Sequence, residues 1–212
     1  MTQKRLRIAL TKGRLQDHTV ELFERMGLDC TPIRHPGRRL VHSIPNYPLD
    51  AVLAKAPDVI TYVEHGVCDL GVVGKDPILE QGRSFYEVLD LGFGRCRFAL
   101  AVREGSDFYG TYKTRRIATK YPNVTRNFFE EKGMDVSIIK IEGSVELAPI
   151  LDLADGIVDI VETGATLREN GLVPIEDVAA VSARLIVNTA SMKLYKEDIL
   201  RLIEGCKANL EG

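Results

Sequence analysis

The sequence has no long hydrophobic run, no paired cysteines and no excess of one charge, and these absences exclude several classes of protein. Its basic start reaches only Ile8-Ala9-Leu10 before Lys12, an apolar stretch too short for a signal peptide, and no run approaches a membrane span. The four cysteines are widely spaced, form no CxxC pair and have no histidines at metal-ligand spacing beside them. We therefore expect a cytoplasmic protein with reduced thiols and no membrane partner, and the sequence has no zinc signature.

The charges are nearly balanced, and no familiar catalytic signature is present. The chain has 28 Lys+Arg against 30 Asp+Glu, a net charge of −2, which argues against a nucleic-acid partner. No GxSxG, P-loop or GxGxxG pattern occurs, so a nucleophilic or hydride-transfer mechanism has no support. The 212 residues, 45% of them hydrophobic, are enough for one large domain or two small ones. An anionic ligand would depend on local basic groups.

The most informative stretch is Asp155–Leu172. Gly156 breaks the preceding segment, Ile157–Val161 is a β-branched run interrupted only by Asp159, and Thr163–Thr166 then leads into a short helical pattern. This order predicts a strand, a tight loop and a helix. A small-residue loop at a helix start presents backbone N–H groups and two hydroxyls to one spot, where the helix dipole also favours an anion. The loop can therefore hold a phosphate.

Two carboxylates precede this loop. Asp159 and Glu162 can accept hydrogen bonds from sugar hydroxyls or reach a metal through water, so together with the loop they indicate a phosphorylated sugar as the ligand. A purely structural interpretation has similar weight, because a Thr-Gly turn after a buried strand is common and Thr166 would also serve as a helix cap. The rest of the chain has to decide between the two.

Two internal repeats indicate a chain built from two related halves. Arg7–Lys12 is matched by Arg116–Lys120, and each segment predicts a strand, then a lysine, then a helix. Gly66–Gly74 parallels Gly156–Gly164, with both glycine pairs eight residues apart. The two repeats have different offsets, so the chain is not a short-period repeat array. We predict two similar α/β lobes.

The predicted architecture is that of the type II periplasmic-binding-protein fold, an α/β class with two similar lobes and a cleft between them. Residues 1–92 with 182–212 would form lobe I, and residues 93–181 would form lobe II. We expect Val178–Val187 to return to lobe I as one strand and a last helix, Lys196–Asn209, to pack on that lobe. Mainly parallel sheets would place ligands beyond the carboxyl ends of the strands.

Basic and glycine-containing turns supply the other candidate ligands. Four polar segments follow predicted strands and would converge on the cleft: Lys12-Gly13-Arg14, Gly74-Lys75-Asp76, Lys120 and Thr163–Thr166. Arg34–Arg39 is typical of a solvated loop, but such a loop would also bring Arg38 or Arg39 onto a polyphosphate, where a planar guanidinium binds two oxygens at once. Gly74 permits close approach by a purine or phosphate, although Asp76 would equally cap a helix.

At Val158–Leu172 the sequence resembles the phosphoribosyl-diphosphate motif of the ATP phosphoribosyltransferase family, whose reaction is the first of histidine biosynthesis. Further segments occur in the family's order and approximate spacing: Lys12–Leu15, Asp69–Asp76, Tyr121–Asn123, Gly143–Glu146 and Thr163–Leu167. The resemblance covers essentially the whole chain. Longer members of the family carry a further C-terminal regulatory domain, whereas this sequence stops at Gly212 after one helix, so it looks like the short form.

The resemblance implies a reaction and an assembly. N1 of the adenine of ATP attacks C1 of the ribose of phosphoribosyl diphosphate and expels pyrophosphate, so no protein nucleophile is required. Mg²⁺ is expected through the substrate phosphates, where it neutralises the leaving group. Short-form members work with a subunit resembling the catalytic core of histidyl-tRNA synthetase, in a hetero-octamer. We expect the same kind of partner here.

On this resemblance we assign the site residues. The phosphate and ribose of phosphoribosyl diphosphate are assigned to Asp159, Glu162, Thr163, Gly164, Ala165 and Thr166. The catalytic contacts to the diphosphate are assigned to Lys12, Arg14 and Arg38. The contacts to ATP are assigned to Asp69, Gly74, Lys75, Asp76, Tyr121 and Glu142. Two rivals stay open: a solute-binding module with the same two lobes, and a phosphoribosyltransferase that acts on a different base.

Overall fold

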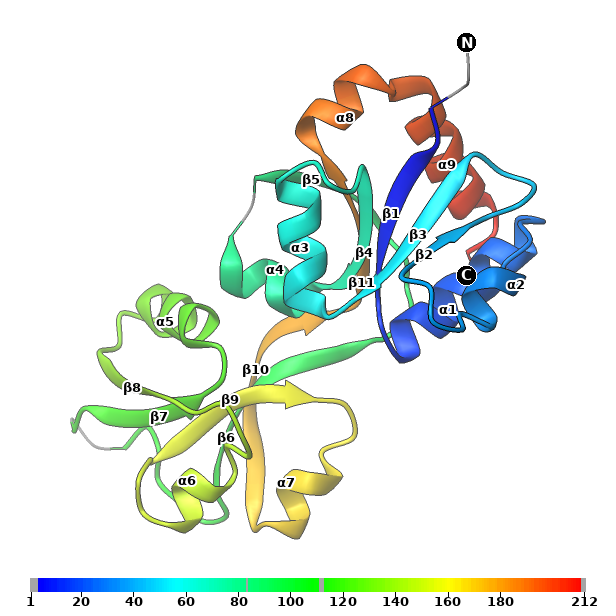
Figure 1. The fold of residues 1–212 in the computed structure, drawn as a ribbon. Helices are drawn as coiled ribbons and strands as arrows, with labels where there is room; N and C mark the ends of the chain where they lie inside the picture. The colour runs from blue at the N-terminus through cyan, green and yellow to red at the C-terminus, as the bar shows by residue number, and fades with distance from the viewer. Residues whose placement is uncertain (1–3, 83, 111–112, 211–212) are drawn as a thin grey trace. The chain divides into compact units, whose positions relative to one another are not determined.

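The computed structural model describes residues 4–82, 84–110 and 113–210, and it contains two compact units (Figure 1). The first unit comprises the chain up to Ile78, Gly82–Gly94 and the chain from Ser182 onward. The second comprises Leu79–Gln81 and Arg95–Val181. Each unit has its own sheet with a hydrophobic core on both faces, so the predicted pair of α/β lobes is confirmed.

The first unit is built on a sheet in which three neighbouring strands are parallel. Its strand order is β2-β3-β1-β4-β11-β5, with β1 (Leu6–Thr11), β2 (Val41–Ser43), β3 (Leu49–Ala54), β4 (Leu70–Gly74), β5 (Phe85–Asp90) and β11 (Ala183–Asn188). β1 pairs in parallel with β3 and β4, whereas β2 pairs antiparallel with β3, and β11 pairs antiparallel with β4 and β5. The carboxyl ends of β1, β3 and β4 therefore share one edge of the sheet.

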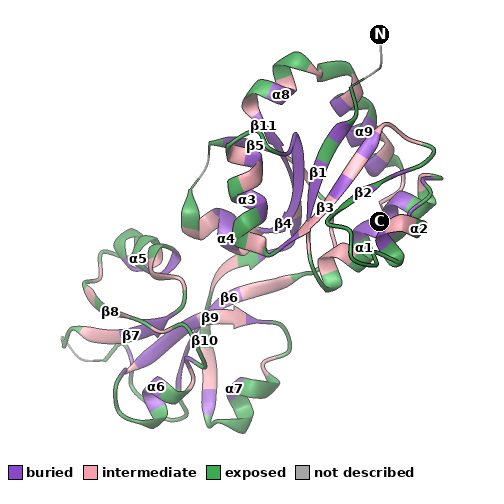
Figure 2. Ribbon diagram, viewed as in Figure 1, coloured by how far each residue is buried: buried purple, intermediate pink, exposed green. Residues whose placement is uncertain are grey.

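Most of β1 is buried (Figure 2), and because successive residues of a strand point to opposite faces, its side chains enter the cores on both sides of this sheet. The helices of this part of the chain are α1 (Arg14–Arg25), α2 (Thr31–Arg34), α3 (Ala56–Glu64), α4 (Lys75–Gln81), α8 (Thr189–Leu194) and α9 (Lys196–Ala208). Ile8 and Leu10 belong to the core that α1 and α9 complete, and Ala9 belongs to the core on the side of α3. The predicted last helix is α9, and it packs on the core of the first unit through Ile199 and Leu202, as expected.

The second unit has a smaller sheet that is also covered on both faces. Its order is β10-β6-β9-β7-β8, with β6 (Cys96–Arg103), β7 (Arg115–Thr119), β8 (Val136–Lys140), β9 (Gly156–Val161) and β10 (Leu172–Val181). β7 pairs in parallel with β8 and β9, whereas β6 pairs antiparallel with β9 and β10. Helix α5 (Pro122–Glu131) packs through Phe129 against one face, and α6 (Leu147–Ile150) and α7 (Ala165–Glu169) pack through Ala148 and Leu167 against the other.

Two details of the predicted fold are wrong. The sheets are mixed rather than mainly parallel, because β2, β6, β10 and β11 pair antiparallel with their neighbours. The return segment Val178–Val187 contains two strands, β10 and β11, which belong to the sheets of different units. Ser182 separates them: its carbonyl accepts from the N–H of Lys75 at 2.9 Å, and its hydroxyl donates to Asp90 at 2.8 Å. A continuous apolar run does not reveal where a chain changes sheets.

Candidate functional site

The carboxyl edge of the first sheet is cationic. β1, β3 and β4 each end immediately before a lysine: Lys12, Lys55 and Lys75. Lys12 and Lys55 follow neighbouring strand ends, because the N–H of Lys12 donates to the carbonyl of Ala54 at 2.9 Å. Both lysines are exposed. Sequence reasoning missed Lys55, although its place directly after a strand was a signal that could have found it.

Arg14 joins this edge from the start of α1. Gly13 precedes it with a φ of +92°, a backbone conformation that favours glycine, and turns the chain from β1 into the helix. Arg14 is exposed. The predicted segment Lys12-Gly13-Arg14 therefore stands at the end of a parallel strand, where open α/β sheets bind their ligands.

Arg38 lies in a loop that leads toward the same edge. The loop connects α2 with β2, and β2 runs antiparallel to β3 with Val41 opposite Val52. In an antiparallel pair one strand begins beside the end of the other, so the loop enters β2 near the carboxyl end of β3. Arg38 and Arg39 are both exposed. The structure thus brings the arginine loop to the same side of the first sheet as Lys12.

The turn at Gly74 is closely approached by a carboxylate. Gly74 is the N-cap residue of α4, and a Cβ atom added there would collide with the carboxylate of Asp76. The Asp76 side chain therefore lies against the backbone of the turn. Both residues remain at the carboxyl end of β4, as the sequence predicts for a ligand-facing turn.

Lys75 is held inside the first unit. Its ammonium forms an ion pair with Glu87 at 2.6 Å, and the two side chains are only 16% and 13% exposed. Arg184 contacts the same carboxylate at 3.3 Å and Asp90 at 3.0 Å. Because its charge is already paired within the unit, we interpret Lys75 as a support of the turn, and its contact with ATP stays a prediction.

Asp69 also has a structural role. It precedes β4, at the opposite end of the strand from Gly74, and is 4% exposed. Its carboxylate accepts hydrogen bonds from Nζ of Lys4 at 3.0 Å, the N–H of Arg7 at 2.8 Å and the hydroxyl of Ser191 at 2.7 Å. A buried acceptor with these partners, at the amino end of a parallel strand, is accounted for by the fold, and the ATP contact of Asp69 stays a prediction.

The loop after β9 has the predicted order of strand, tight loop and helix. Gly164 adopts a φ of +72° and is the N-cap residue of α7. The N–H of Ala165 donates to the hydroxyl of Thr163 at 3.3 Å, and Arg168 donates to the carbonyl of Thr163 at 3.1 Å. Thr163, Ala165 and Thr166 are all exposed. The loop therefore presents two hydroxyls and backbone N–H groups that solvent can reach.

Asp159 lies within β9, on the face where Val161 packs against α6 and α7. Burial raises the pKa of Asp159 above its usual range, and the carboxylate of Glu146 raises it further. The N–H of Ile160 and the ammonium of Lys120 act in the opposite direction. A carboxylate that is partly withdrawn from water gains from any hydrogen-bond donor that a ligand brings.

Three further predicted residues follow the parallel strands of the second sheet. Glu162 comes directly after β9 and is exposed. Tyr121 follows β7, and its ring packs edge-on against Phe98 with the centroids 4.8 Å apart. Glu142 follows β8 and pairs with Lys140 at 2.8 Å, which lowers the pKa of Glu142. The predicted ATP residues are therefore divided between the units, since Tyr121 and Glu142 belong to the second and the turn after β4 to the first.

Neither a metal cluster nor a membrane span is found in the described chain. Across residues 4–82, 84–110 and 113–210, no three His, Cys, Asp or Glu side chains are grouped so that they could hold a metal ion. Within the same ranges, no helix has the length and apolar character needed to cross a membrane. Asp159 and Glu162 precede the loop after β9 as two separate carboxylates, one within the strand and one directly after it.

Comparisons with known proteins agree with the motifs. A family model of ATP phosphoribosyltransferase matches residues 55–208. The ATP phosphoribosyltransferases of Clostridium kluyveri and Clostridium acetobutylicum are 59% and 58% identical to this chain, in each case over 98% of its length. The matches cover 95% and 97% of those two proteins. The similarity is therefore one of whole chains.

Solved structures share the fold. A chain of the ATP phosphoribosyl transferase (HisG:HisZ) complex from Thermotoga maritima is 32% identical with a TM-score of 0.81, over 97% of this chain and 98% of that one. The periplasmic aliphatic sulphonate binding protein SsuA from Escherichia coli has a TM-score of 0.61 at 13% identity, over 98% of this chain and 73% of that one, which confirms the predicted fold class. The chain belongs to the ATP phosphoribosyltransferase family, the pentosyltransferases that begin histidine biosynthesis by transferring the phosphoribosyl group of phosphoribosyl diphosphate to N1 of ATP.

Proposed function

We propose that Thr163–Thr166 holds the 5′-phosphate of phosphoribosyl diphosphate and that Asp159 and Glu162 bind its ribose. The observation that carries this proposal is the open loop, in which the hydroxyls of Thr163 and Thr166 are exposed after a parallel strand and close in sequence to two carboxylates. A phosphate needs donors and ribose hydroxyls need acceptors. One segment of the second unit thus matches both parts of a phosphoribosyl group.

The diphosphate is assigned to cations of the first unit: Lys12, Arg14 and Arg38, with Lys55 added to the predicted set. Lys55 is included because it is exposed on the strand end next to Lys12. The transition state carries positive charge on the ribose and increasing negative charge on the leaving group. Cations that are already in place stabilise that leaving group more than they stabilise the substrate, which accelerates the reaction.

The chain supplies position and charge rather than a nucleophile. N1 of ATP forms a bond to C1 of the ribose while the bond from C1 to the diphosphate oxygen breaks, and the electron pair of that bond leaves with the pyrophosphate. No side chain becomes covalently attached. The tasks of the protein are to align the two substrates and to keep water away from C1, where it would compete with ATP.

Mg²⁺ fits the donor set of the ribose site. This ion prefers oxygen ligands and is commonly bound through one or two carboxylates together with substrate phosphates. Asp159 and Glu162 provide two carboxylates beside the phosphate loop. They would hold the ion jointly with phosphoribosyl diphosphate, and the ion would neutralise part of the diphosphate charge.

For ATP we retain Gly74 and Asp76 of the first unit and Tyr121 and Glu142 of the second. Gly74 has no side chain, so a purine or phosphate would approach the backbone closely once the Asp76 carboxylate turns aside. The phenol of Tyr121 and the carboxylate of Glu142 are hydrogen-bonding groups at the ends of parallel strands. Lys75 and Asp69 are left out as direct contacts, because their side chains are paired inside the first unit.

We also propose a partner. The related chain from Thermotoga maritima is part of a HisG:HisZ complex. By analogy, this chain would assemble in the cytoplasm with a subunit resembling the catalytic core of histidyl-tRNA synthetase, as a hetero-octamer. The mass of the complex purified after co-expression of both subunits, measured by light scattering, would test the stoichiometry.

The proposed site is tested by pyrophosphate release from the purified chain supplied with phosphoribosyl diphosphate, ATP and Mg²⁺. Adenine absorption is followed in parallel, and pyrophosphatase is added to draw the reaction forward. We expect release that requires ATP and is accompanied by a change in the adenine spectrum. Thr163→Ala and Asp159→Asn should both reduce it, whereas Thr61→Ala, an exposed threonine of α3, should not.

A negative result has a defined meaning. Without turnover, the assay is repeated with the synthetase-like subunit present. If ATP and phosphoribosyl diphosphate then bind without any release of pyrophosphate, the chain acts as a binding module, the rival from another functional class. If pyrophosphate is released only when a nucleotide with a base other than adenine is supplied, the assignment of Thr163–Thr166 to the phosphate is kept and the assignment of ATP as substrate is wrong.

A further inference from the structure

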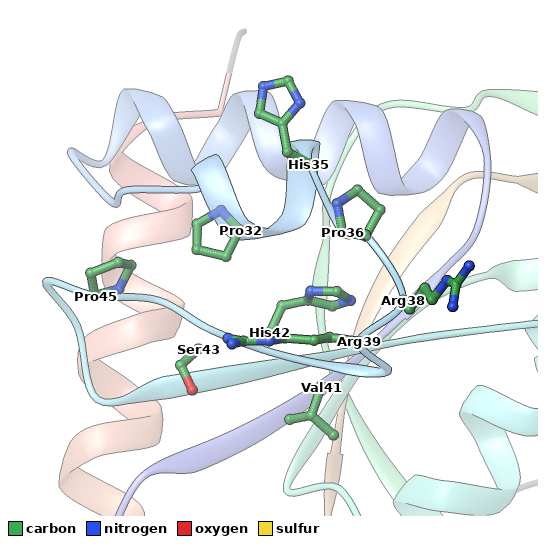
Figure 3. A pocket seen from close by; sticks show the side chains of 10 residues that line it. Pro32, His35, Pro36, Arg38, Arg39, Val41, His42, Ser43 and Pro45 are labelled. Atoms are coloured by element: carbon green, nitrogen blue, oxygen red, sulfur yellow. The ribbon is translucent and has the colours of Figure 1, made fainter.

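A cavity of about 590 Å³ lies in the first unit between α2 and β2 (Figure 3). This volume is in the range of small-molecule sites. Its lining combines three prolines and a valine with the polar side chains of His35, Arg38, Arg39, His42 and Ser43. No aspartate or glutamate is among these described lining residues. The wall is therefore cationic on one part and apolar on another, which suits an anion that carries an apolar portion.

His42 is the buried polar group of this cavity. Its side chain is 3% exposed, on β2 opposite Ala51 of β3. Nothing in the described ranges forms a hydrogen bond, ion pair or ring contact with the imidazole. Among the described residues, the ring nitrogens of His42 do not belong to the fully enclosed side-chain atoms, so they reach open space, and the cavity provides it. A polar ring in this position lacks the partner that a ligand would supply.

Arg39 brings a positive charge to the same wall. Gly37, with a φ of +57°, turns the chain ahead of the arginines, and the N–H of Arg39 donates to the carbonyl of Pro36 at 3.2 Å. Arg39 and His42 both line the cavity, and in Figure 3 the end of the Arg39 side chain lies toward Ser43, whereas Arg38 points away. No carboxylate in the described part of the chain pairs with the Arg39 guanidinium. Its two parallel N–H donors are thus available to an oxyanion.

We propose that this cavity is an anion site for a phosphate group, with Arg39 and His42 as its ligands. Arg39 can bind two phosphate oxygens at once, and His42 can donate a ring N–H to the same group. Neither residue belongs to the contacts assigned to the reaction, so the site goes beyond the proposed function and does not depend on it. Two ligands could supply this phosphate group: the pyrophosphate that the reaction releases, and a separate phosphorylated small molecule.

The test is NMR of the histidine rings in the full chain, with inorganic pyrophosphate added at constant ionic strength. The His42 signal is identified by its absence in His42→Gln or, if that variant does not fold, by elimination with variants of the three exposed histidines. We expect a saturable shift of this signal in wild type and in Arg126→Ala. In Arg39→Ala the apparent affinity should fall roughly tenfold, the loss that accompanies one charge-assisted hydrogen bond. Arg126→Ala is the matched control because it removes the same charge from an exposed position on α5, outside the lining of the cavity.

Two results would overturn the proposal: no shift of the His42 signal at saturating pyrophosphate, or an equal loss of affinity in the two arginine variants. Phosphoribosyl diphosphate is then added to separate the sources. Displacement of pyrophosphate from the cavity supports the diphosphate of the reaction as the natural ligand, and simultaneous binding supports a separate phosphorylated one. Turnover of the same samples is recorded to keep the two proposals separate. Turnover without pyrophosphate binding at His42 counts only against the cavity proposal. Pyrophosphate binding at His42 without turnover counts only against the proposed function.

Discussion

The turn after β4 and the loop after β9 share a sequence pattern but have different structures. Gly66–Gly74 and Gly156–Gly164 have the same spacing, and in each the second glycine is the N-cap residue of a helix. Gly74 is extended, with a φ of −65°, and the Asp76 carboxylate covers it. Gly164 is left-handed and is followed by exposed residues. The first turn is supported from inside its unit, and the second loop is open to a ligand.

The aspartates of the two segments differ in the same way. Asp69 precedes its strand, and protein donors including Ser191 occupy its carboxylate. Asp159 lies within its strand, and burial raises its pKa. The Asp69 carboxylate stabilises the fold. The Asp159 carboxylate remains available to a ligand, and its burial lowers the stability of the folded chain. A repeated pattern therefore predicts the architecture, but the role of each residue depends on the partners that the folded chain brings to it.

The largest expected effect comes from the ion pairs behind the first turn. Glu87→Ala would leave Lys75 and Arg184 as largely buried charges without this carboxylate, so it should lower the free energy of unfolding by about 3 to 5 kcal/mol. Urea denaturation followed by circular dichroism measures the change. Arg201→Ala is the control: it breaks an exposed pair with Asp198 and should change stability by less than about 1 kcal/mol. An equally small loss in Glu87→Ala would mean that the first turn is not supported from inside.

The next effect concerns the cationic edge of the first unit. Arg14→Ala should lower turnover roughly a hundredfold or more, because one preorganised charged contact is typically worth about 2.7 to 4 kcal/mol in the transition state. Steady-state release of pyrophosphate measures turnover, and circular dichroism checks that the exposed substitution leaves the fold unchanged. Wild-type turnover in the folded variant would remove Arg14 from the site.

Asp69 provides a direct test of the structural side of the comparison. Asp69→Asn weakens a buried acceptor, so it should cost about 1 to 3 kcal/mol of stability while the KM for ATP stays at the wild-type value. Urea denaturation and steady-state kinetics on one preparation give both quantities. A raised KM with unchanged stability would return Asp69 to the ATP site.

Thr166 tests the ligand side. Thr166→Val keeps the shape of the side chain and removes its hydroxyl, so the Kd for phosphoribosyl diphosphate should rise roughly tenfold, as for one lost hydrogen bond to a charged group. Titration calorimetry measures the affinity. Thr61→Val on α3 is the matched control and should bind like wild type. An unchanged affinity in Thr166→Val would contradict the phosphate assignment of the loop.

The smallest effect is a pH dependence of stability. Because burial raises the folded-state pKa of Asp159, the folded protein holds its proton more tightly, and stability falls as the pH rises from the unfolded pKa through the folded one. Asp159→Asn should therefore have a higher Tm than wild type at neutral pH, and the difference should disappear in the acid range. Thermal unfolding followed by circular dichroism measures this.

Asp155→Asn is the control of opposite sign. Despite partial burial, hydrogen bonds from Arg116 lower the pKa of Asp155, so its stabilisation is present above the unfolded pKa and is lost as the pH falls through the folded one. This variant should have a lower Tm than wild type at neutral pH. If both aspartate variants shifted the Tm in the same direction, the contrast between buried and paired carboxylates would fail.

Much of the fold could be predicted because it depends on short-range chemistry. Hydrophobic periodicity predicts strand β1 and helix α9. Gly27 predicts the end of α1, and in the structure this glycine has a φ of +82°. The loop Thr163–Thr166 was equally predictable, since its glycine, its hydroxyls and the strand before it lie within a few residues of one another. For such features the sequence contains nearly all the partners.

The internal partners of Asp69 and Lys75 could not be predicted, because they are distant in the sequence. Ser191 and Arg7, which occupy the carboxylate of Asp69, are 122 and 62 positions away from it in the chain. The ion pair of Lys75 with Glu87 forms because β11 lies between β4, which leads into Lys75, and β5, which contains Glu87. Local pattern contains no information about such pairings, because many foldings of the same chain would satisfy the pattern.

By itself, the sequence determined the two-lobed α/β architecture, the family, the reaction and the form of the loop after β9, since each rests on local order or on motifs along the whole chain. Only the tertiary structure decided that Asp69 and Lys75 face inward, that Lys55 stands beside Lys12 on the next strand end, and that His42 lines a cavity without a partner. The physical reason is that burial and electrostatic pairing are set by neighbours in space, and these are known only when the strands have a register.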